Sequence, residues 1–245
     1  MAVERIETFA ELHEALAPFK GSASQWIFRG HASIHWTLVP KAGRIRWLSG
    51  RPLADLEYFA AWKTRAIEYI TARPESDWDW LAIAQHHGLA TRLLDWTSHP
   101  LSAAFFALEP DVNEDAALFA YHPEFRVDTD TSGLADIPGV LGLKPKGVAQ
   151  RITRQAAVFT VHSPPTAELS VATEGSRLRR FVIARTARKQ LLRELDFYGV
   201  NRSTLFPDLD GLAAYMNWYA ENGYDVSSPS ASNPSLQPTS ELHSR

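Results

Sequence analysis

The feature that most constrains this sequence is the stretch of residues 80–108, where polar side chains are interspersed closely among large apolar ones. Neighbouring Leu, Trp and Phe residues draw such polar groups into or beside the core, where each unpaired group costs several kcal/mol. A chain tolerates that cost for a structural hydrogen-bond network or for a functional site, and this stretch alone favours neither. Its polar members are Gln85, His86, His87, Thr91, Arg92, Asp95, Thr97, Ser98 and His99.

The same stretch predicts a helix, a turn, a short strand and a second helix. Gly88 is placed to end the first helix in a left-handed cap. A buried strand is expected at residues 93–96, followed by Thr97 or Ser98 as the N-cap of the second helix. Pro100 then falls in the first turn, where its missing N–H costs little, and the free N–H groups there could hold an anion.

Hydrophobic periodicity and turn residues predict the remaining elements. A long surface loop is expected at residues 126–147, and Arg188 is expected on the exposed face of a basic helix. Together the elements predict an α+β fold, a single domain over residues 1–225 with a central mixed or antiparallel sheet surrounded by helices. Residues 226–245 are expected to be a disordered tail. Further helices are expected at residues 5–18, 52–72 and 186–197 and after the N-cap Asp208, and further strands at 26–28, 116–121, 158–162 and 179–184. The spacing of Thr8 and Glu11 predicts a capping box in the first of these helices.

Composition excludes several classes of protein. The net charge of −3 over 245 residues gives no field that would favour nucleic acid or an acidic membrane. The absence of cysteine excludes disulfides and thiolate metal sites, and we expect no metal site. No apolar run reaches transmembrane length, and the N-terminus lacks the apolar core of a signal peptide. A soluble cytoplasmic protein is therefore expected, with its oligomeric state left open.

Arg29 stands out because it ends a predicted buried strand. An arginine in that position pairs with a carboxylate or clamps a phosphate with two hydrogen bonds. The alternative to a ligand site is a structural ion pair, for which Asp95 is the expected partner.

An ordered series of motifs resembles the FRG domain family, which is named after the triplet at residues 28–30. The resemblance extends over most of residues 5–224, with departures at Ala90, where proline is usual, and at residues 156–157, where glycine is expected. The family has no agreed activity. Many of its members look like stand-alone bacterial or phage proteins, some in defence or toxin contexts, and this context does not specify a mechanism. The partner expected for this chain is a nucleotide-like small molecule or a protein. The motif residues are Phe28, Arg29, Gly30, His31, Trp36, Leu38, Pro40, Gln85, His86, His87, Gly88, Thr91, Arg92, Asp95, Trp96, Thr97, Pro100, Arg151, Gln155 and 205–211.

The first functional hypothesis is an NAD-binding fold similar to that of ADP-ribosyltransferases, with a comparable order of motifs. By this analogy Arg29 holds a phosphate or a ribose hydroxyl, and Thr97 and Ser98 shape the nicotinamide pocket. A neutral Gln155 stabilises an oxocarbenium-like transition state poorly, so catalysis would be weak or would use another group. NAD is thus the cofactor to test, although the residues themselves require none. The expected catalytic residues are Arg29, Asp95, Gln155 and His86, and the expected cofactor-binding residues are Phe28, Gly30, His31, Arg92, Thr97 and Ser98.

Two further hypotheses remain open. A hydrolase or nuclease would use His86 or His87 as a general base oriented by Asp95. A binding module without chemistry would instead place Arg29, Asp95, Gln85 and Gln155 in one buried polar network that specifies the fold.

Overall fold

The computed structural model describes residues 4–22, 26–70, 73–144 and 157–222. Contacts between residues divide the chain into two compact units, Met1–Tyr198 and Gly199–Arg245. The first unit contains the whole sheet, and the second contains α10 (Arg202–Leu205) and α11 (Leu209–Glu221). The expected single domain over residues 1–225 stays a prediction, and the tail at 226–245 lies outside the described residues.

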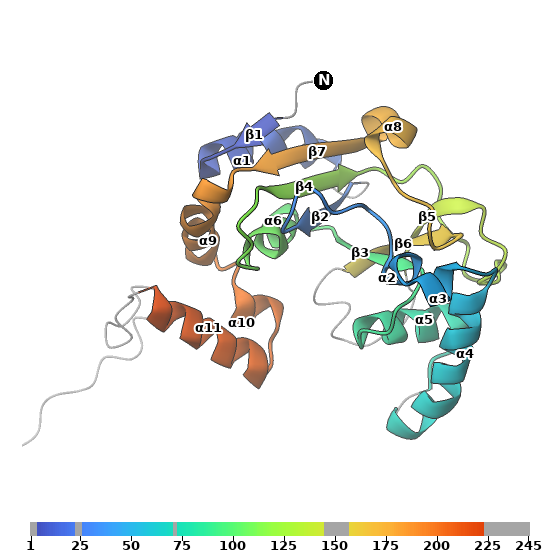
Figure 1. Ribbon diagram of the computed structural model, residues 1–245. Helices are drawn as coiled ribbons and strands as arrows, with labels where there is room; N and C mark the ends of the chain where they lie inside the picture. Colours follow the sequence, from blue (N-terminus) through green and yellow to red (C-terminus); the bar gives the residue numbers. More distant parts are fainter. Residues whose placement is uncertain (1–3, 23–25, 71–72, 145–156, 223–245) are drawn as a thin grey trace, which may run out of the picture. The chain divides into compact units, whose positions relative to one another are not determined.

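The first unit is built on a seven-stranded mixed sheet (Figure 1), which confirms the expected α+β class. The strand order is β1-β7-β4-β2-β3-β6-β5, with β1 and β7 parallel and the other neighbours antiparallel. The strands are β1 (Glu4–Ile6), β2 (Ile27–His31), β3 (Leu93–Thr97), β4 (Ala116–Tyr121), β5 (Gly139–Leu143), β6 (Ala157–Ser163) and β7 (Leu178–Ile183).

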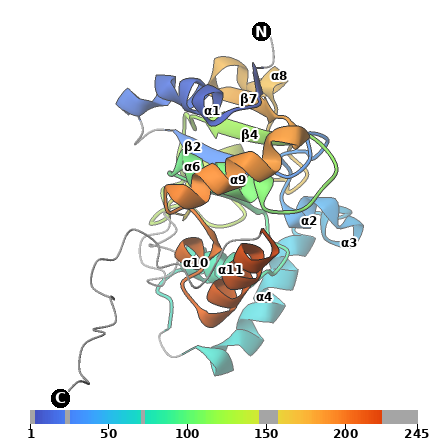
Figure 2. The same cartoon turned by 90° about the vertical axis from the view of Figure 1, so that its left-hand side faces the viewer.

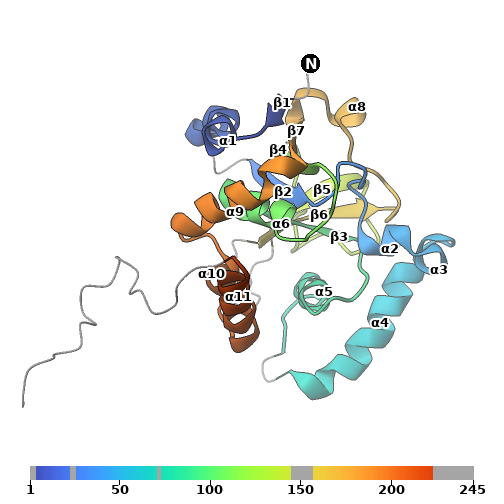
Figure 3. The same cartoon turned by 60° about the vertical axis from the view of Figure 1, so that its left-hand side comes forward.

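Helices pack against this sheet. Figure 2 shows α6 against β2 and α9 beside α6, and Figure 3 shows α5 next to α4. No helix within the described ranges has both the length and the apolar character needed to cross a bilayer. The α-helices are α1 (Phe9–Leu16), α2 (Lys41–Arg44), α3 (Arg46–Ser49), α4 (Ala54–Ala66), α5 (Asp77–His86), α6 (Pro100–Leu108), α8 (Val171–Glu174) and α9 (Arg188–Phe197). The 3-10 helices are η1 (Ala17–Ser22), η2 (Ile67–Tyr69), η3 (Gly175–Arg177) and η4 (Arg185–Ala187).

Several local predictions are confirmed. Thr8 caps α1 in a capping box with Glu11, and Gly88 follows α5 with φ +83°. Pro100 is the first residue of α6, and Asp208 caps α11. Short-range signals of this kind act within one or two turns, so the local sequence is enough to identify them.

Four predictions are wrong. Residues 5 and 6, expected at the start of the helix at 5–18, belong to β1 instead, because Glu4–Ile6 pairs with β7 far away in sequence. The expected loop at 126–147 contains β5, which pairs with β6 at the sheet edge. The N-cap of α6 is His99 instead of Thr97 or Ser98, and the backbone N–H of His99 donates a hydrogen bond to the Thr97 hydroxyl. Arg188, which was expected on the exposed face of a helix, is buried.

Arg188 is buried because its guanidinium binds backbone carbonyls from several segments. It donates to the oxygens of Ala107, Leu108 and Pro110 at the end of α6, and to those of Ala32 and Glu114. The last carbonyls of a helix have no partner inside the helix, so this side chain completes the end of α6. Arg188, which the sequence placed on an exposed helix face, therefore stabilises the fold.

Arg92 forms the most completely buried ion pair that the structure describes. Its guanidinium donates to both carboxylate oxygens of Asp55 at 2.7 and 2.8 Å and to the Leu134 carbonyl at 3.0 Å. The side chains of Arg92 and Asp55 are 1% and 2% exposed. This pair joins α4 to the start of β3.

We predict that Arg92→Met lowers the free energy of unfolding by about 3–5 kcal/mol, because it leaves Asp55 buried without a counter-charge. Arg92→Met combined with Asp55→Leu should recover much of that loss. The control is Arg51→Met, which breaks the exposed Arg51–Glu57 pair and should cost no more than about 1 kcal/mol in urea unfolding. Equal losses in the two single variants would contradict the assignment of Arg92 to the core.

Candidate functional site

The triplet at residues 28–30 has its side chains on alternate faces of β2. Phe28 is buried on the face that α6 covers. Gly30 lies on the same face, where an added Cβ would collide with the backbone oxygen of Ala103 and the backbone nitrogen of Ala107. Successive side chains of a strand point to opposite faces, so Arg29 and His31 lie on the other side. The triplet therefore combines two packing residues with one free to form a site.

Arg29 lies where β2 and β3 diverge. The two strands are in register at Phe28 and Thr97, whereas β2 pairs with β4 along its whole length. Beyond Phe28 the Arg29 guanidinium takes the place of further strand pairing, since Nη1 donates to the backbone oxygen of Asp95 at 2.6 Å.

The contacts of Arg29 are mainly with neutral groups. Nε donates to Nε2 of His31 at 2.9 Å. The Asp95 carboxylate is 4.0 Å from Nη1, and the side chains of Arg29 and Asp95 are 22% and 54% exposed. The two residues therefore do not form the fully buried ion pair that was the alternative to a site.

His31 is held as a neutral acceptor. Its Nδ1 donates to the Trp36 carbonyl at 3.2 Å, which leaves Nε2 free to accept from Arg29. Burial, followed by charge repulsion from Arg29, lowers the pKa of His31 to about 3. The imidazole thus orients the guanidinium at neutral pH without adding charge.

The charges around Arg29 and His31 are mostly positive. Arg44 lowers the pKa of both residues by charge repulsion, and Arg180 lowers that of His31. Burial is the main reason that the pKa of Arg29 is lowered, and Asp95 opposes the shift. This environment favours the approach of an anion.

Asp95 belongs to a second set of hydrogen bonds that links α5 to β3. Its Oδ2 accepts from Nε2 of Gln85 at 2.7 Å, and Oε1 of Gln85 accepts from the Thr91 hydroxyl at 2.5 Å. The Thr91 oxygen in turn accepts from the backbone N–H of Leu93 at 3.1 Å. The chain Thr91–Gln85–Asp95 fixes the carboxylate, which faces solvent at the end of the chain.

A buried polar chain on the neighbouring strands was not expected from the sequence. Nε1 of Trp96 donates to the Thr160 hydroxyl at 3.0 Å, which donates to Nε2 of His162 at 2.8 Å. Nδ1 of His162 donates to the Ala167 carbonyl at 2.6 Å, and burial lowers the pKa of His162 to about 4. Alternating polar residues in β6 were the one available sequence signal.

The other expected site residues are placed as follows. Arg92 is buried in the core, where Nε and Nη2 bind Asp55 and Nη1 binds the Leu134 carbonyl, so its guanidinium does not belong to the set of groups around Arg29. Thr97 is buried, Ser98 is half-buried, and His86 is half-buried in the last turn of α5. Gln155 lies outside the described residues.

Across the described part of the chain, no three His, Asp or Glu side chains are grouped as metal ligands.

We predict that the free energy of unfolding decreases as the pH falls from about 6.5 toward 4, partly because His31 stays neutral when folded. The unfolded chain binds a proton in this window that the folded chain does not, which costs up to about 1.4 kcal/mol per pH unit for each such histidine. Urea unfolding between pH 7 and 4.5 should therefore show a shallower pH dependence for His31→Gln than for the wild type. His35→Gln, at an exposed position, should keep the wild-type dependence. An unchanged slope in His31→Gln would contradict the depressed pKa.

Comparison with known proteins agrees with part of this picture. The family model described as FRG domain matches residues 24–116, which include β2, β3, α5 and α6. The resembling motifs after residue 116 lie outside that match. Neither a curated protein nor a solved structure matches the chain. An FRG domain is therefore present over residues 24–116, the part of the chain that the family model matches.

Proposed function

We propose that this domain binds a nucleotide-type anion at Arg29, with NAD as the ligand to test first. The proposal rests on the hydrogen bonding of the three guanidinium nitrogens. Nε and Nη1 are fixed by His31 and by the Asp95 carbonyl, whereas Nη2 has no hydrogen-bond partner among the described residues. A partly exposed, oriented arginine with an unused donor is suited to a phosphate oxygen.

Neighbouring groups supply the other contacts that a nucleotide needs. Trp36 is 53% exposed, and the centroids of the Trp36 and His31 rings are 6.0 Å apart. The indole therefore offers a surface for base stacking. The Asp95 carboxylate, held by Gln85, can accept a ribose hydroxyl. Arg44 adds positive charge that a diphosphate would meet.

Cleavage of NAD would require a carboxylate near the ribose, as in ADP-ribosyl transfer. Among the described residues around Arg29, Asp95 is the group of that chemistry. The chain Thr91–Gln85–Asp95 is equally compatible with binding alone, so a non-catalytic module in a defence or toxin system is the second candidate. A histidine-based hydrolase has less support, because the side chain that donates a hydrogen bond to the Asp95 carboxylate is Gln85 and not a histidine.

We expect calorimetric titration to show NAD binding by the wild type and binding weakened about ten- to a hundredfold in Arg29→Met, through loss of a charge-assisted hydrogen bond. Arg65→Met, which removes an exposed arginine of α4, is the matched control and should bind NAD as the wild type does. Absence of binding by the wild type, or equal affinities in Arg29→Met and Arg65→Met, would refute the proposal.

Asp95→Asn separates binding from chemistry. If the domain cleaves NAD, nicotinamide release by the wild type should be lost in Asp95→Asn while NAD binding persists. Binding without nicotinamide release in the wild type would identify a binding module instead.

A further inference from the structure

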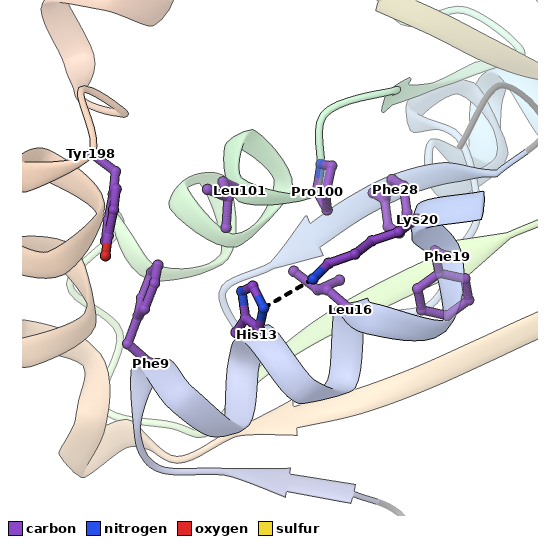
Figure 4. A pocket seen from close by; sticks show the side chains of 9 residues that line it. All are labelled: Phe9, His13, Leu16, Phe19, Lys20, Phe28, Pro100, Leu101 and Tyr198. Atoms are coloured by element: carbon purple, nitrogen blue, oxygen red, sulfur yellow. Dashed lines mark hydrogen bonds between the residues drawn. The ribbon is translucent and has the colours of Figure 1, made fainter. Parts of the chain in front are cut away.

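We propose that a second site, on the α6 side of β2, binds an amphipathic monoanion with a carboxylate at one end and an apolar body. The structure contains a cavity of about 510 Å³ between α1, η1, β2, the first turn of α6 and the end of α9 (Figure 4). Its volume falls in the range of small-molecule sites and exceeds the voids of a well-packed core. The lining residues are Phe9, His13, Leu16, Phe19, Lys20, Phe28, Pro100, Leu101 and Tyr198.

The walls of this cavity are apolar and come from well-packed elements. Leu16, Phe19 and Phe28 are buried and form its inner side. The rings of Phe9 and Tyr198 stack 5.0 Å apart at another side. An aliphatic chain placed here would exchange water for apolar contacts, whereas ribose hydroxyls would find few partners.

The charge of the lining selects one kind of head group. Lys20 carries the one formal charge of the lining residues, with no Asp or Glu among them. Its Nζ donates to Nε2 of His13 at 3.0 Å, and Figure 4 shows the side chain extending toward His13. The ammonium is thereby held beside the apolar walls, where a single carboxylate would complete an ion pair. One positive charge matches a monoanion better than a diphosphate.

This cavity is separate from the nucleotide site proposed above. Phe28 faces the cavity, and Arg29, the next residue of β2, belongs to the opposite face. The two sites can therefore be tested independently in the same protein.

The test is calorimetric titration of the full chain with decanoate below its micellar concentration, beside decanol and decyltrimethylammonium. Decanoate should bind at a ratio of one to one, decanol at least threefold more weakly, and the cation not measurably. Lys20→Gln should bring decanoate down to the affinity of decanol. Lys189→Gln, at an exposed position of α9, is the matched control and should match the wild type.

Two variants test the apolar walls. Leu101→Trp should fill the cavity and abolish binding of both decanoate and decanol. Phe9→Glu places a carboxylate at the start of α1, where a helix tolerates negative charge, so it should fold and weaken decanoate more than decanol. Melting curves check that each variant is folded, and NAD titration of Lys20→Gln should equal that of the wild type.

Three results would overturn the proposal. They are the absence of decanoate binding by the wild type, equal affinities for decanoate, decanol and the cation, and unchanged decanoate binding in both Lys20→Gln and Phe9→Glu. None of them bears on Arg29, whose role is judged by NAD titration alone.

Discussion

The close approach of α6 to β2 at Gly30 is the contact on which both proposed sites depend. The backbone of α6 lies where a side chain at this position would be, so glycine is required by contact with Ala103 and Ala107. The close contact of α6 with β2 buries Phe28 on one face of the sheet. It also fixes the strand from which Arg29 projects on the other face. A packing constraint of this kind explains why phenylalanine, arginine and glycine occur together.

Three arginines show how differently the chain uses the same side chain. Arg92 neutralises a buried carboxylate, and Arg188 binds backbone carbonyls at the end of α6. Both are committed to the fold. Arg29 instead is oriented by a neutral imidazole and a backbone carbonyl, and it keeps a donor that no described residue uses. An anion bound to Arg29 would complete its hydrogen bonding without disturbing the core. The cavity beside Lys20 is a separate site with mainly apolar walls.

The sequence predicted most helices and strands because their signals are local: apolar periodicity, the capping box at Thr8 and the glycine after α5. It missed β1 and β5, whose formation depends on pairing with distant strands. The motif residues Arg29, Gln85 and Asp95 do meet where β2 and β3 diverge. The sequence could not show that Arg92 pairs with Asp55, that Arg188 is buried, or that His162 completes a buried chain. Each depends on segments that only the folded chain brings together.

The contacts of Arg29 assign it to a ligand site and not to a buried ion pair, and a double-mutant cycle of Arg29→Met and Asp95→Asn on urea unfolding distinguishes the two. Asparagine keeps the backbone carbonyl that Arg29 binds and removes the carboxylate 4.0 Å away. The geometry predicts a coupling energy below about 1 kcal/mol, as for exposed ion pairs. A loss of about 3–5 kcal/mol in each single variant, with the double variant no less stable than either, would show that Arg29 and Asp95 form a buried pair and that Arg29 is not a ligand residue.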